Sequence, residues 1–309
     1  MERTSLHQVV CFGEVLWDLL PTKALPGGAP MNVAYHLQKL GSHPALISKI
    51  GTDDYGKGLV DMLASNGLTT DFLQVDYTHP TGLVYAKPNE HNEVVYDIVF
   101  PSAWDFITWQ DDFAPLVAEA GFFVYGSLTS RNKVSRETLY RLLEIAKTKV
   151  LDINLRPPHF NRTHVESLLR HADILKMNIA ELELITGWFS QFANTEDRMK
   201  LIQDRFHIDT IIVTMGGEGA IVSNKGIVYR HEGFHVTVAD TIGSGDAFLA
   251  GFIYRLLNGA GMEDALTFAS GTGAFIATQS GACPSYEVSQ ITALMQAATH
   301  KNANLFYNN

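Results

Sequence analysis

Short apolar runs and helical patterns alternate along most of the chain, and this alternation limits the fold more than any other feature of the sequence. The strand candidates are residues 9–15, 45–50, 122–125, 150–154, 174–177, 210–215 and 234–239. Patterns with apolar residues at helical spacing fall between them. Strands that alternate with helices favour a mostly parallel sheet with helices on both faces. We therefore predict an α/β fold in which ligands bind beyond the carboxyl ends of the strands.

Size, charge and cysteine content narrow the class of protein. The chain has 309 residues, of which 46% are hydrophobic and 18% charged, as is typical of a globular protein. A net charge of −10 argues against nucleic acid or an anionic membrane surface as the main partner. We expect no membrane span and no secretory signal, and therefore a cytoplasmic protein. We expect Cys11 and Cys283 to be free thiols.

One glycine-rich stretch stands where the last strand candidate meets a helical pattern: Asp240-Thr-Ile-Gly-Ser-Gly-Asp246. The first N–H groups of a helix have no partner within it, the helix dipole is positive there, and glycines let an anion approach. We therefore expect Gly243, Ser244 and Gly245 to form an anion hole. Asp246 would stand beside it as a base, which is the arrangement that phosphoryl transfer to a hydroxyl needs. A strand–helix turn with an acidic residue in its first helical turn is the alternative explanation.

A second glycine turn follows the first strand candidate. Gly27-Gly28-Ala-Pro-Met-Asn32 comes just before a helical pattern, and Gly13-Glu-Val-Leu-Trp-Asp18 lies upstream of it. The two glycines allow a ligand to approach the backbone closely. Asp18 and Asn32 offer hydrogen bonds to hydroxyl groups, so with Gly27 and Gly28 they are candidate substrate-binding residues. An ordinary turn next to a polar residue is the other explanation.

These two stretches resemble the two signatures of the ribokinase-type (PfkB) carbohydrate kinases, with Ser244 where the usual family form has Ala. The Gly-Gly-Ala-Pro-x-Asn motif resembles that of the fructokinase branch. Ribokinases usually have Gly-Gly-Lys-Gly-Ala-Asn, and deoxygluconate kinases have Asp after the two glycines. The resemblance covers about residues 9–285. It implies a single ribokinase-like α/β domain over residues 1–309 with a small β lid, whose strands are inserted at about residues 14–26 and 80–106.

Two alternating segments, residues 81–87 and 93–100, flank residues 89–92 and predict a β-hairpin outside the main sheet. In the family such strands form a lid over the sugar and often mediate dimerisation. The resemblance therefore implies a homodimer formed through the lid, with Phe100 lining the sugar site. Packing of aromatic residues within the hairpin explains Phe100 equally well.

A polar run ends the strand candidate at residues 150–154. Asp152, Asn154 and Arg156 precede two prolines, which stop the element and hold these side chains in a loop. The run resembles the same position in fructokinases and deoxygluconate kinases, where the Arg faces the transferred phosphate or the acceptor. A planar, permanently charged guanidinium suits phosphate oxygens. A surface Arg paired with a carboxylate is the alternative.

Two further resemblances concern cations. Asn178 and Glu181, at the start of a helical pattern, resemble the family's magnesium-linked motif, which acts partly through waters. The same two residues can also form a capping box. Asp240 and Ser285 resemble the positions that hold a potassium-type ion in many relatives.

The resemblance implies a nucleotide site in the last third of the chain. Thr214 and Gly216 match positions that touch the nucleotide. The segment at residues 266–278 is rich in Ala, Gly and Ser, which would let an adenine lie against it, although close helix packing explains these residues equally well. The predicted nucleotide contacts are Asn178, Thr214, Gly216, Gly217, Gly219, Gly243, Gly245, Ser270 and Ala274.

Together these motifs predict an ATP-dependent sugar kinase that converts fructose to fructose 6-phosphate, with Asp246 as general base and Mg²⁺ bridging the nucleotide phosphates. Ribose, deoxygluconate and nucleosides remain alternative acceptors. A sugar-binding regulator without turnover and a dinucleotide oxidoreductase are alternatives from other classes. A regulator needs no base, and Phe248 stands where the dinucleotide fingerprint needs its third glycine. We expect the last ten residues to form a loose tail.

Overall fold

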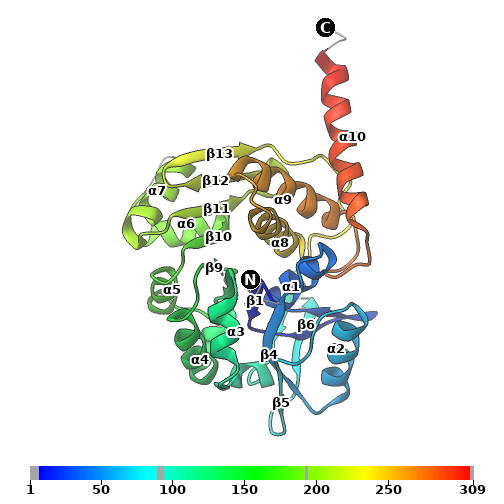
Figure 1. Cartoon of the computed structure of the whole chain (residues 1–309), viewed down its shortest axis with the longest axis vertical. Coiled ribbons are helices and arrows are strands. Elements are labelled where there is room, and N and C mark those ends of the chain that lie inside the picture. The colour runs from blue at the N-terminus through cyan, green and yellow to red at the C-terminus, as the bar shows by residue number, and fades with distance from the viewer. Residues whose placement is uncertain (1–6, 89–93, 192–193, 307–309) are drawn as a thin grey trace, which may run out of the picture.

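The computed structural model describes residues 7–88, 94–191 and 194–306, and these form two sheets with helices around the larger one (Figure 1). The strands of the large sheet are β1 (Val9–Phe12), β4 (Ala45–Gly51), β5 (Leu73–Asp76), β8 (Phe122–Gly126), β9 (Lys149–Asp152), β10 (Ile174–Asn178), β11 (Thr210–Thr214), β12 (Ala220–Asn224) and β13 (Ile227–His231). Their order is β13-β12-β11-β10-β9-β8-β1-β4-β5. Neighbouring strands from β11 to β5 run parallel, and β12 and β13 are antiparallel additions at one edge. The predicted mostly parallel α/β fold is confirmed.

Central strands are buried on both faces, and their side chains alternate between two cores. In β1 the side chains of Val9 and Cys11 belong to one core, and those of Val10 and Phe12 belong to the other. All four residues are fully buried. This is why a central strand reads in the sequence as a continuous apolar run.

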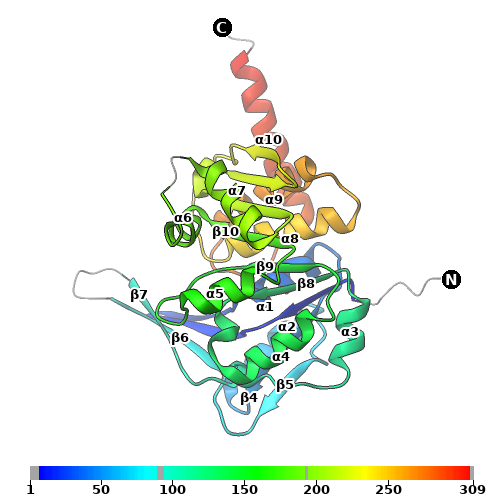
Figure 2. The ribbon, with the colours of Figure 1, turned by 90° about the vertical axis from the view of Figure 1, so that its left-hand side faces the viewer.

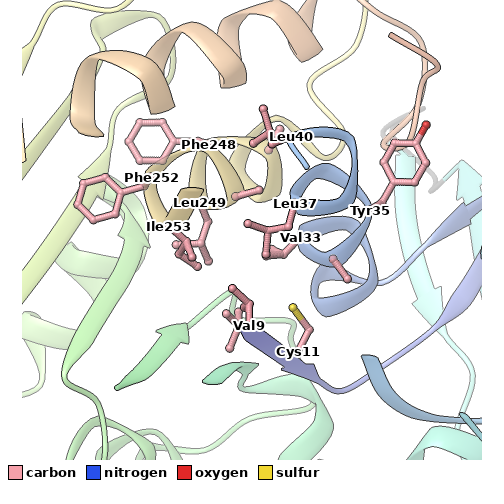
Figure 3. Packing of buried hydrophobic residues seen from close by; sticks show 14 of the residues in the cluster. Val9, Cys11, Val33, Tyr35, Leu37, Leu40, Phe248, Leu249, Phe252 and Ile253 are labelled. Carbon is pink, nitrogen blue, oxygen red and sulfur yellow. The ribbon is translucent and has the colours of Figure 1, made fainter. Parts of the chain in front are cut away.

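Each core is closed by its own set of helices. The helices on one face are α1 (Ala29–Lys39), α2 (Asp54–Ser65), α8 (Ser244–Leu257), α9 (Met262–Ala277) and the start of α10 (Val288–Phe306). Those on the other are α3 (Phe113–Glu119), α4 (Lys133–Leu143), α5 (Arg162–Leu169), α6 (Ile179–Gly187) and α7 (Thr195–Phe206). Short 3₁₀ turns are η1 (Ala103–Phe106), η2 (Leu128–Arg131) and η3 (Gly216–Glu218). Figure 3 shows Leu249 of α8 and Leu37 of α1 above Val9 of β1, so α1 and α8 share the core that carries the site.

Helices α8 and α9 approach closely because small residues lie between them. A methyl group added at Gly251 would come within 2.8 Å of Thr272 Oγ1. One added at Gly273 would come within 3.1 Å of the Ser244 carbonyl oxygen. Close helix packing therefore accounts for part of the Ala, Gly and Ser content of α9.

The small sheet is built from two segments that are far apart in the sequence. One segment gives β2 (Leu16–Leu20) and β3 (Lys23–Gly27), and the other gives β6 (Gly82–Pro88) and β7 (Val94–Ile98). The strand order is β3-β2-β6-β7, with β2 and β6 parallel and the two outer pairs antiparallel. Figure 2 shows β6 and β7 extending to one side of the large sheet. The predicted hairpin is confirmed, while its turn at residues 89–92 lies outside the described residues.

One predicted strand is wrong. Residues 234–239 form no strand, although their sequence alternates between apolar and polar residues. Among the strands that the structure describes, β13 is the last at this edge of the sheet, and residues 234–239 do not pair with it. The apolar members of the run, Phe234, Val236 and Val238, line a cavity instead. Phe234 and Val236 are partly buried while Val238 is 56% exposed, so the run alternates in sequence without the regular burial of a strand.

Other element ends also differ from prediction. The strand expected at residues 9–15 ends at Phe12, and the one expected at 150–154 ends at Asp152. Asn154 beyond it has a left-handed backbone with φ of 38°. The last ten residues are not a loose tail throughout, because α10 continues to Phe306 and stands away from the sheets (Figure 1). Within the described ranges, no helix has the length and apolar character to cross a membrane.

Candidate active site

Helix α8 begins at Gly243, a position where any residue other than glycine would be strained. Gly243 is the N-cap of α8 with φ of 75°, and no side chain caps the helix. A methyl group at Gly243 would lie 2.6 Å from the Cα of Ala282. Both the left-handed backbone and the close approach of another segment therefore require glycine. The N–H of Ser244 donates to the carbonyl of Thr241 at 3.2 Å, and the Ser244 hydroxyl donates to it at 2.9 Å, so Ser244 is turned back onto its own loop.

Asp246 lies in the first turn of this helix, within reach of α1. The Asn32 Nδ2 donates a hydrogen bond of 2.8 Å to Asp246 Oδ2. Burial, and then the negative charge of Asp152, raise the pKa of Asp246 to about 7. Lys176, the Asn32 hydrogen bond and Arg156 act in the opposite direction. A carboxylate with a pKa near neutral can accept a proton at physiological pH and then release it.

A buried lysine that the sequence analysis did not single out lies beneath the same helix. Lys176, on β10, donates a 2.7 Å hydrogen bond to Asp152 Oδ2 on β9, where the two residues are direct neighbours across the sheet. A methyl group at Gly245 would lie 3.3 Å from Lys176 Nζ, which places the ammonium under the first turn of α8. Although burial alone would lower it, nearby carboxylates raise the pKa of Lys176. The available signal was a charged residue inside an apolar strand, which is costly unless the charge is paired.

Glu181 and Asn178 form the capping box at the start of α6. Asn178 accepts from the Glu181 N–H at 2.9 Å, and Glu181 Oε2 accepts from the Asn178 N–H at 2.8 Å. Glu181 Oε1 accepts from the Leu155 N–H at 2.8 Å. Both carboxylate oxygens therefore already hold backbone groups. Across the described ranges, no cluster of three His, Cys, Asp or Glu side chains gathers in a way that could hold a metal ion.

Asp240 joins the two loops that meet at the start of α8. Its Oδ1 accepts from the Ile242 N–H at 3.0 Å, and its Oδ2 accepts from the Gly281 N–H at 3.1 Å. Ser285 lies in the loop after Gly281 and is exposed. The structure thus ties Asp240 to the start of the loop that carries Ser285, through backbone contacts.

A cavity of about 200 Å³ lies beside the start of α8, between α9 and the loops that follow β11 and β13. Its lining residues are Thr214, Gly216, Gly217, Gly219, Gly233, Phe234, Val236, Val238, Thr241, Ser244, Gly245, Phe248, Ser270, Gly273, Ala274 and Ala277. Of the predicted nucleotide contacts, Asn178 and Gly243 fall outside this lining and the other residues fall within it. The Oγ of Ser270 is buried with no hydrogen-bond partner in the part of the chain that the structure describes.

Asp18 and Gly28 lie where the small sheet meets α1. The carboxylate of Asp18 lies against Gly27, where any side chain would collide with it. Gly28 is the N-cap of α1 with φ of 113°, and a methyl group there would meet the Glu14 carbonyl oxygen. Burial raises the pKa of Asp18 to about 6, against the lowering effect of Arg156.

Arg156 and Phe100 are two exposed residues of the predicted site. The charge of Arg156 lowers the pKa values of Asp18 and Asp246, while its Nη1 donates to the Leu155 carbonyl at 3.2 Å. Phe100 is 55% exposed, and the guanidinium of Arg131 lies 5.0 Å from the centre of its ring. Phe100 lies two residues after the end of β7, and one side of its ring packs against Arg131.

The family model described as pfkB family carbohydrate kinase matches residues 7–288. Fructokinase-1 of Oryza sativa subsp. japonica is 30% identical, over 94% of this chain and 98% of its own length. Among solved structures, fructokinase of Vibrio cholerae O395 in its fructose-, ADP- and calcium-bound form superposes with a TM-score of 0.80 at 26% identity, covering 94% of this chain and 99% of its own. Fructokinase of Xylella fastidiosa with bound ATP has a TM-score of 0.84 at 22% identity, covering 94% of this chain and 98% of its own.

Proposed function

The chain belongs to the pfkB family of carbohydrate kinases, and from this membership we propose that it transfers the γ-phosphoryl group of ATP to fructose, giving fructose 6-phosphate. Asp246 carries the proposal. It combines a partly buried carboxylate, a pKa of about 7 and a position in the first turn of a helix whose N-cap, Gly243, has no side chain. The fructokinase relatives, which match almost the whole chain, support the choice of sugar.

In the proposed reaction a fructose hydroxyl oxygen attacks the γ-phosphorus of ATP. The hydroxyl proton passes to a carboxylate oxygen of Asp246 as the new O–P bond forms. The bond between the γ-phosphorus and the bridging oxygen of ADP breaks, and ADP leaves with that electron pair. Asn32 keeps the carboxylate turned toward α1 through its 2.8 Å hydrogen bond.

Negative charge spreads over the phosphoryl oxygens in the transition state, and the start of α8 suits it. The helix dipole is positive at this end. Gly243 lets the helix begin in close contact with Ala282, and the ammonium of Lys176 lies just beneath Gly245. We propose that Arg156 stabilises the same negative charge from the side of the acceptor sugar, because its positive charge already lowers the pKa values of Asp18 and Asp246.

We assign the cavity beside α8 to the nucleotide. Adenine would lie against Ala274 and Ser270 of α9, whose buried hydroxyl then gains a partner. The phosphates would run past Thr214 and Gly245 toward Asp246. Apolar walls with a few polar groups are typical of such sites.

The assigned cations differ in their fit to the side chains. Mg²⁺ neutralises nucleotide phosphates when it is bound, and Glu181 would reach it through water, since both its carboxylate oxygens hold backbone N–H groups. Asp240 and the loop carrying Ser285 are the proposed neighbours of a potassium-type ion. There Asp240 would act chiefly by fixing the loop, because each of its oxygens accepts a backbone N–H.

The sugar is assigned to the space between α1 and the small sheet, which would act as its lid. Asp18 and backbone groups next to Gly28 would bind hydroxyl groups there, while the Glu14 carbonyl fills the space that a side chain at Gly28 would need. The small sheet exposes 38% of Tyr85 and 48% of Tyr96. The register of β6 and β7 places these two rings on opposite faces of the sheet. We propose that a second copy of the chain packs against the small sheet in a homodimer.

The turn before α1 lacks two contacts that other acceptors would use, and this favours fructose. Pro30 stands at the start of α1 and has no N–H, so this turn cannot make the amide contact that a ribokinase-like Lys-Gly pair could. Ala29 supplies no carboxylate, so the contact made by the Asp of deoxygluconate kinases is missing as well. A site built to pair particular hydroxyls can reject mismatched analogues by as much as ~10⁴ in kcat/KM.

The test is a side-by-side measurement of ATP turnover with fructose, ribose, deoxygluconate and adenosine, at fixed Mg²⁺ and potassium. We expect the highest kcat/KM for fructose, and a fall in kcat of roughly 10²–10⁴-fold in Asp246→Asn with sugar affinity retained. A clear win for another acceptor would reassign the sugar and leave the kinase in place. Sugar binding without turnover of any acceptor would favour a regulator instead.

A further inference from the structure

Asn32 is held from both ends of its side-chain amide. Its Nδ2 donates to Asp246 Oδ2 at 2.8 Å, and its Oδ1 accepts from the Cys283 thiol at 3.3 Å. The three side chains come from α1, the first turn of α8 and the loop that follows α9. They form one chain of hydrogen bonds that ends on the proposed base.

The donor and acceptor roles in this chain follow from its chemistry. An ionised Asp246 can only accept, so the amide nitrogen of Asn32 must face it. The amide oxygen of Asn32 then faces Cys283, and the sulfur must carry a proton to donate to it. Burial and the charge of Asp246 raise the pKa of the Cys283 thiol, which keeps that proton in place. An amide turned the other way would set its oxygen against the carboxylate.

Cys283 is itself fixed, because its two neighbours in the loop are bound to α1. Tyr35 donates its hydroxyl to the Pro284 carbonyl at 2.8 Å. His36 Nε2 lies 2.9 Å from the Ala282 carbonyl, which can only accept, so Nε2 carries the proton. Its Nδ1 then accepts from the Tyr286 hydroxyl at 3.0 Å.

The protonation of His36 agrees with this arrangement. Its ring is fully buried, and burial lowers the pKa of His36 to about 4. The imidazole is therefore neutral at physiological pH, with one donor and one acceptor nitrogen, and both are used. These hydrogen bonds hold the loop around Cys283 against α1.

We propose that Cys283 is a positioning residue for the phosphoryl-transfer step, which acts on Asp246 through Asn32 by locking the orientation of the Asn32 amide. The proposal rests on the proposed role of Asp246 as base. In this role the Cys283 thiol acts as a hydrogen-bond donor with a fixed direction. A cysteine with a purely packing role would only fill space.

The proposal predicts a change in the ionisation of Asp246. The charged groups that act on this carboxylate are Asp152, which raises its pKa, and Lys176 and Arg156, which lower it. The Asn32 hydrogen bond also lowers the pKa of Asp246. If the amide loses its fixed orientation, this last contribution weakens and the pKa of Asp246 rises.

The experiment compares Cys283→Ala with Cys283→Ser in kcat, KM and the pH profile of kcat. In Cys283→Ala we expect kcat to fall about three- to tenfold, the size of one neutral hydrogen bond, with the acidic limb moved to higher pH. Cys283→Ser keeps a donor and should restore both quantities. The thermal midpoint of each variant shows whether the fold is intact.

A double-mutant cycle with Asn32→Ala separates coupling from general damage. Cys283→Ala should cost nothing further once Asn32 is removed. The proposal is overturned if Cys283→Ala and Cys283→Ser are equally impaired, or if Cys283→Ala leaves both kcat and the acidic limb unchanged. Wild-type turnover in Asp246→Asn is a separate result, because it would remove the base itself.

Discussion

Lys176 and Asp152 form a 2.7 Å ion pair beneath the first turn of α8, with only 8% and 6% of their side chains exposed. Taking two charges out of water costs several kcal/mol per ion, so such a pair is weak support for the fold by itself. Its position is more informative. The ammonium lies against Gly245, at the end of α8 where the helix dipole already favours an anion.

The first prediction concerns this pair. Lys176→Met should destabilise the protein by about 3–5 kcal/mol, because Asp152 is left buried without its cation. The double variant Lys176→Met/Asp152→Leu should regain most of that stability, since apolar side chains of similar volume can replace a buried pair. Turnover should stay low in both variants. Urea unfolding and kcat measure the two effects, and recovery of turnover in the double variant would assign the pair a purely structural role.

The second prediction is the pH dependence. With a pKa of about 7, Asp246 is protonated below neutral pH and cannot take the sugar proton. We therefore expect kcat to fall about tenfold for each pH unit below that value. A flat profile between pH 5 and 8, at concentrations that saturate both substrates, would contradict the role of Asp246.

The same pKa shift predicts an effect on stability. The pKa of Asp246 is higher in the folded protein than the ordinary value of 3.8 for an aspartate side chain in water. The protonated Asp246 side chain is therefore favoured by folding. The stabilisation that this gives is fully present below pH 3.8 and is lost as the pH rises through about 7. Asp246→Asn should raise the free energy of unfolding at pH 8 by at least about 1 kcal/mol and should change it little at pH 4. Destabilisation at pH 8 would show that the carboxylate supports the fold.

The third prediction uses two glycines at opposite ends of α8. Gly243 and Gly259 both have φ of 75°. A methyl group would meet Ala282 at the first, whereas at the second no atom of the described residues lies within 4 Å. Gly259→Ala should cost about 1–2 kcal/mol from the left-handed backbone alone. Gly243→Ala should cost a further 1–3 kcal/mol or so, from overpacking against Ala282, and should abolish turnover. Equal losses of stability in the two variants would show that the close contact is unimportant.

The fourth prediction concerns the small sheet. If β6 and β7 close over the sugar, binding should slow amide hydrogen exchange in these two strands. Exchange in the core strand β8 serves as the internal control, because it is buried with or without ligand. Unchanged exchange in β6 and β7 on saturation with a phosphorylated sugar would contradict the lid assignment.

Much of the architecture could be predicted from the sequence because parallel strands and their helices have local patterns. The chain order of these patterns gave the parallel sheet, and glycines marked the starts of α1 and α8 correctly. The alternation of Phe234, Val236 and Val238 gave a wrong strand prediction, because an alternating pattern does not reveal whether a neighbouring strand exists to pair with.

The contacts between distant residues could not be predicted. Lys176 was missed because its partner Asp152 stands on another strand, and only the register of β9 and β10 brings them together. Asn32 was expected to bind sugar, yet it is 4% exposed and bonded to Asp246, which lies 214 positions further along the chain. Whether it also contacts sugar remains a prediction. Sequence spacing carries no information on such a pairing.

The hydrogen bonds from Tyr35 and His36 to residues 282–286 join positions up to 250 apart in the chain. During synthesis, therefore, the second half of α1 has no partners for these hydrogen bonds until residues 282–286 have left the ribosome. Contacts of such long range form late and slowly. Until then the polar groups of α1 would stay exposed to water. Enzyme activity should therefore appear only after residues 282–286 have joined α1. A nascent chain that ends before residue 282 lacks these partners and should not bind substrate as the folded protein does.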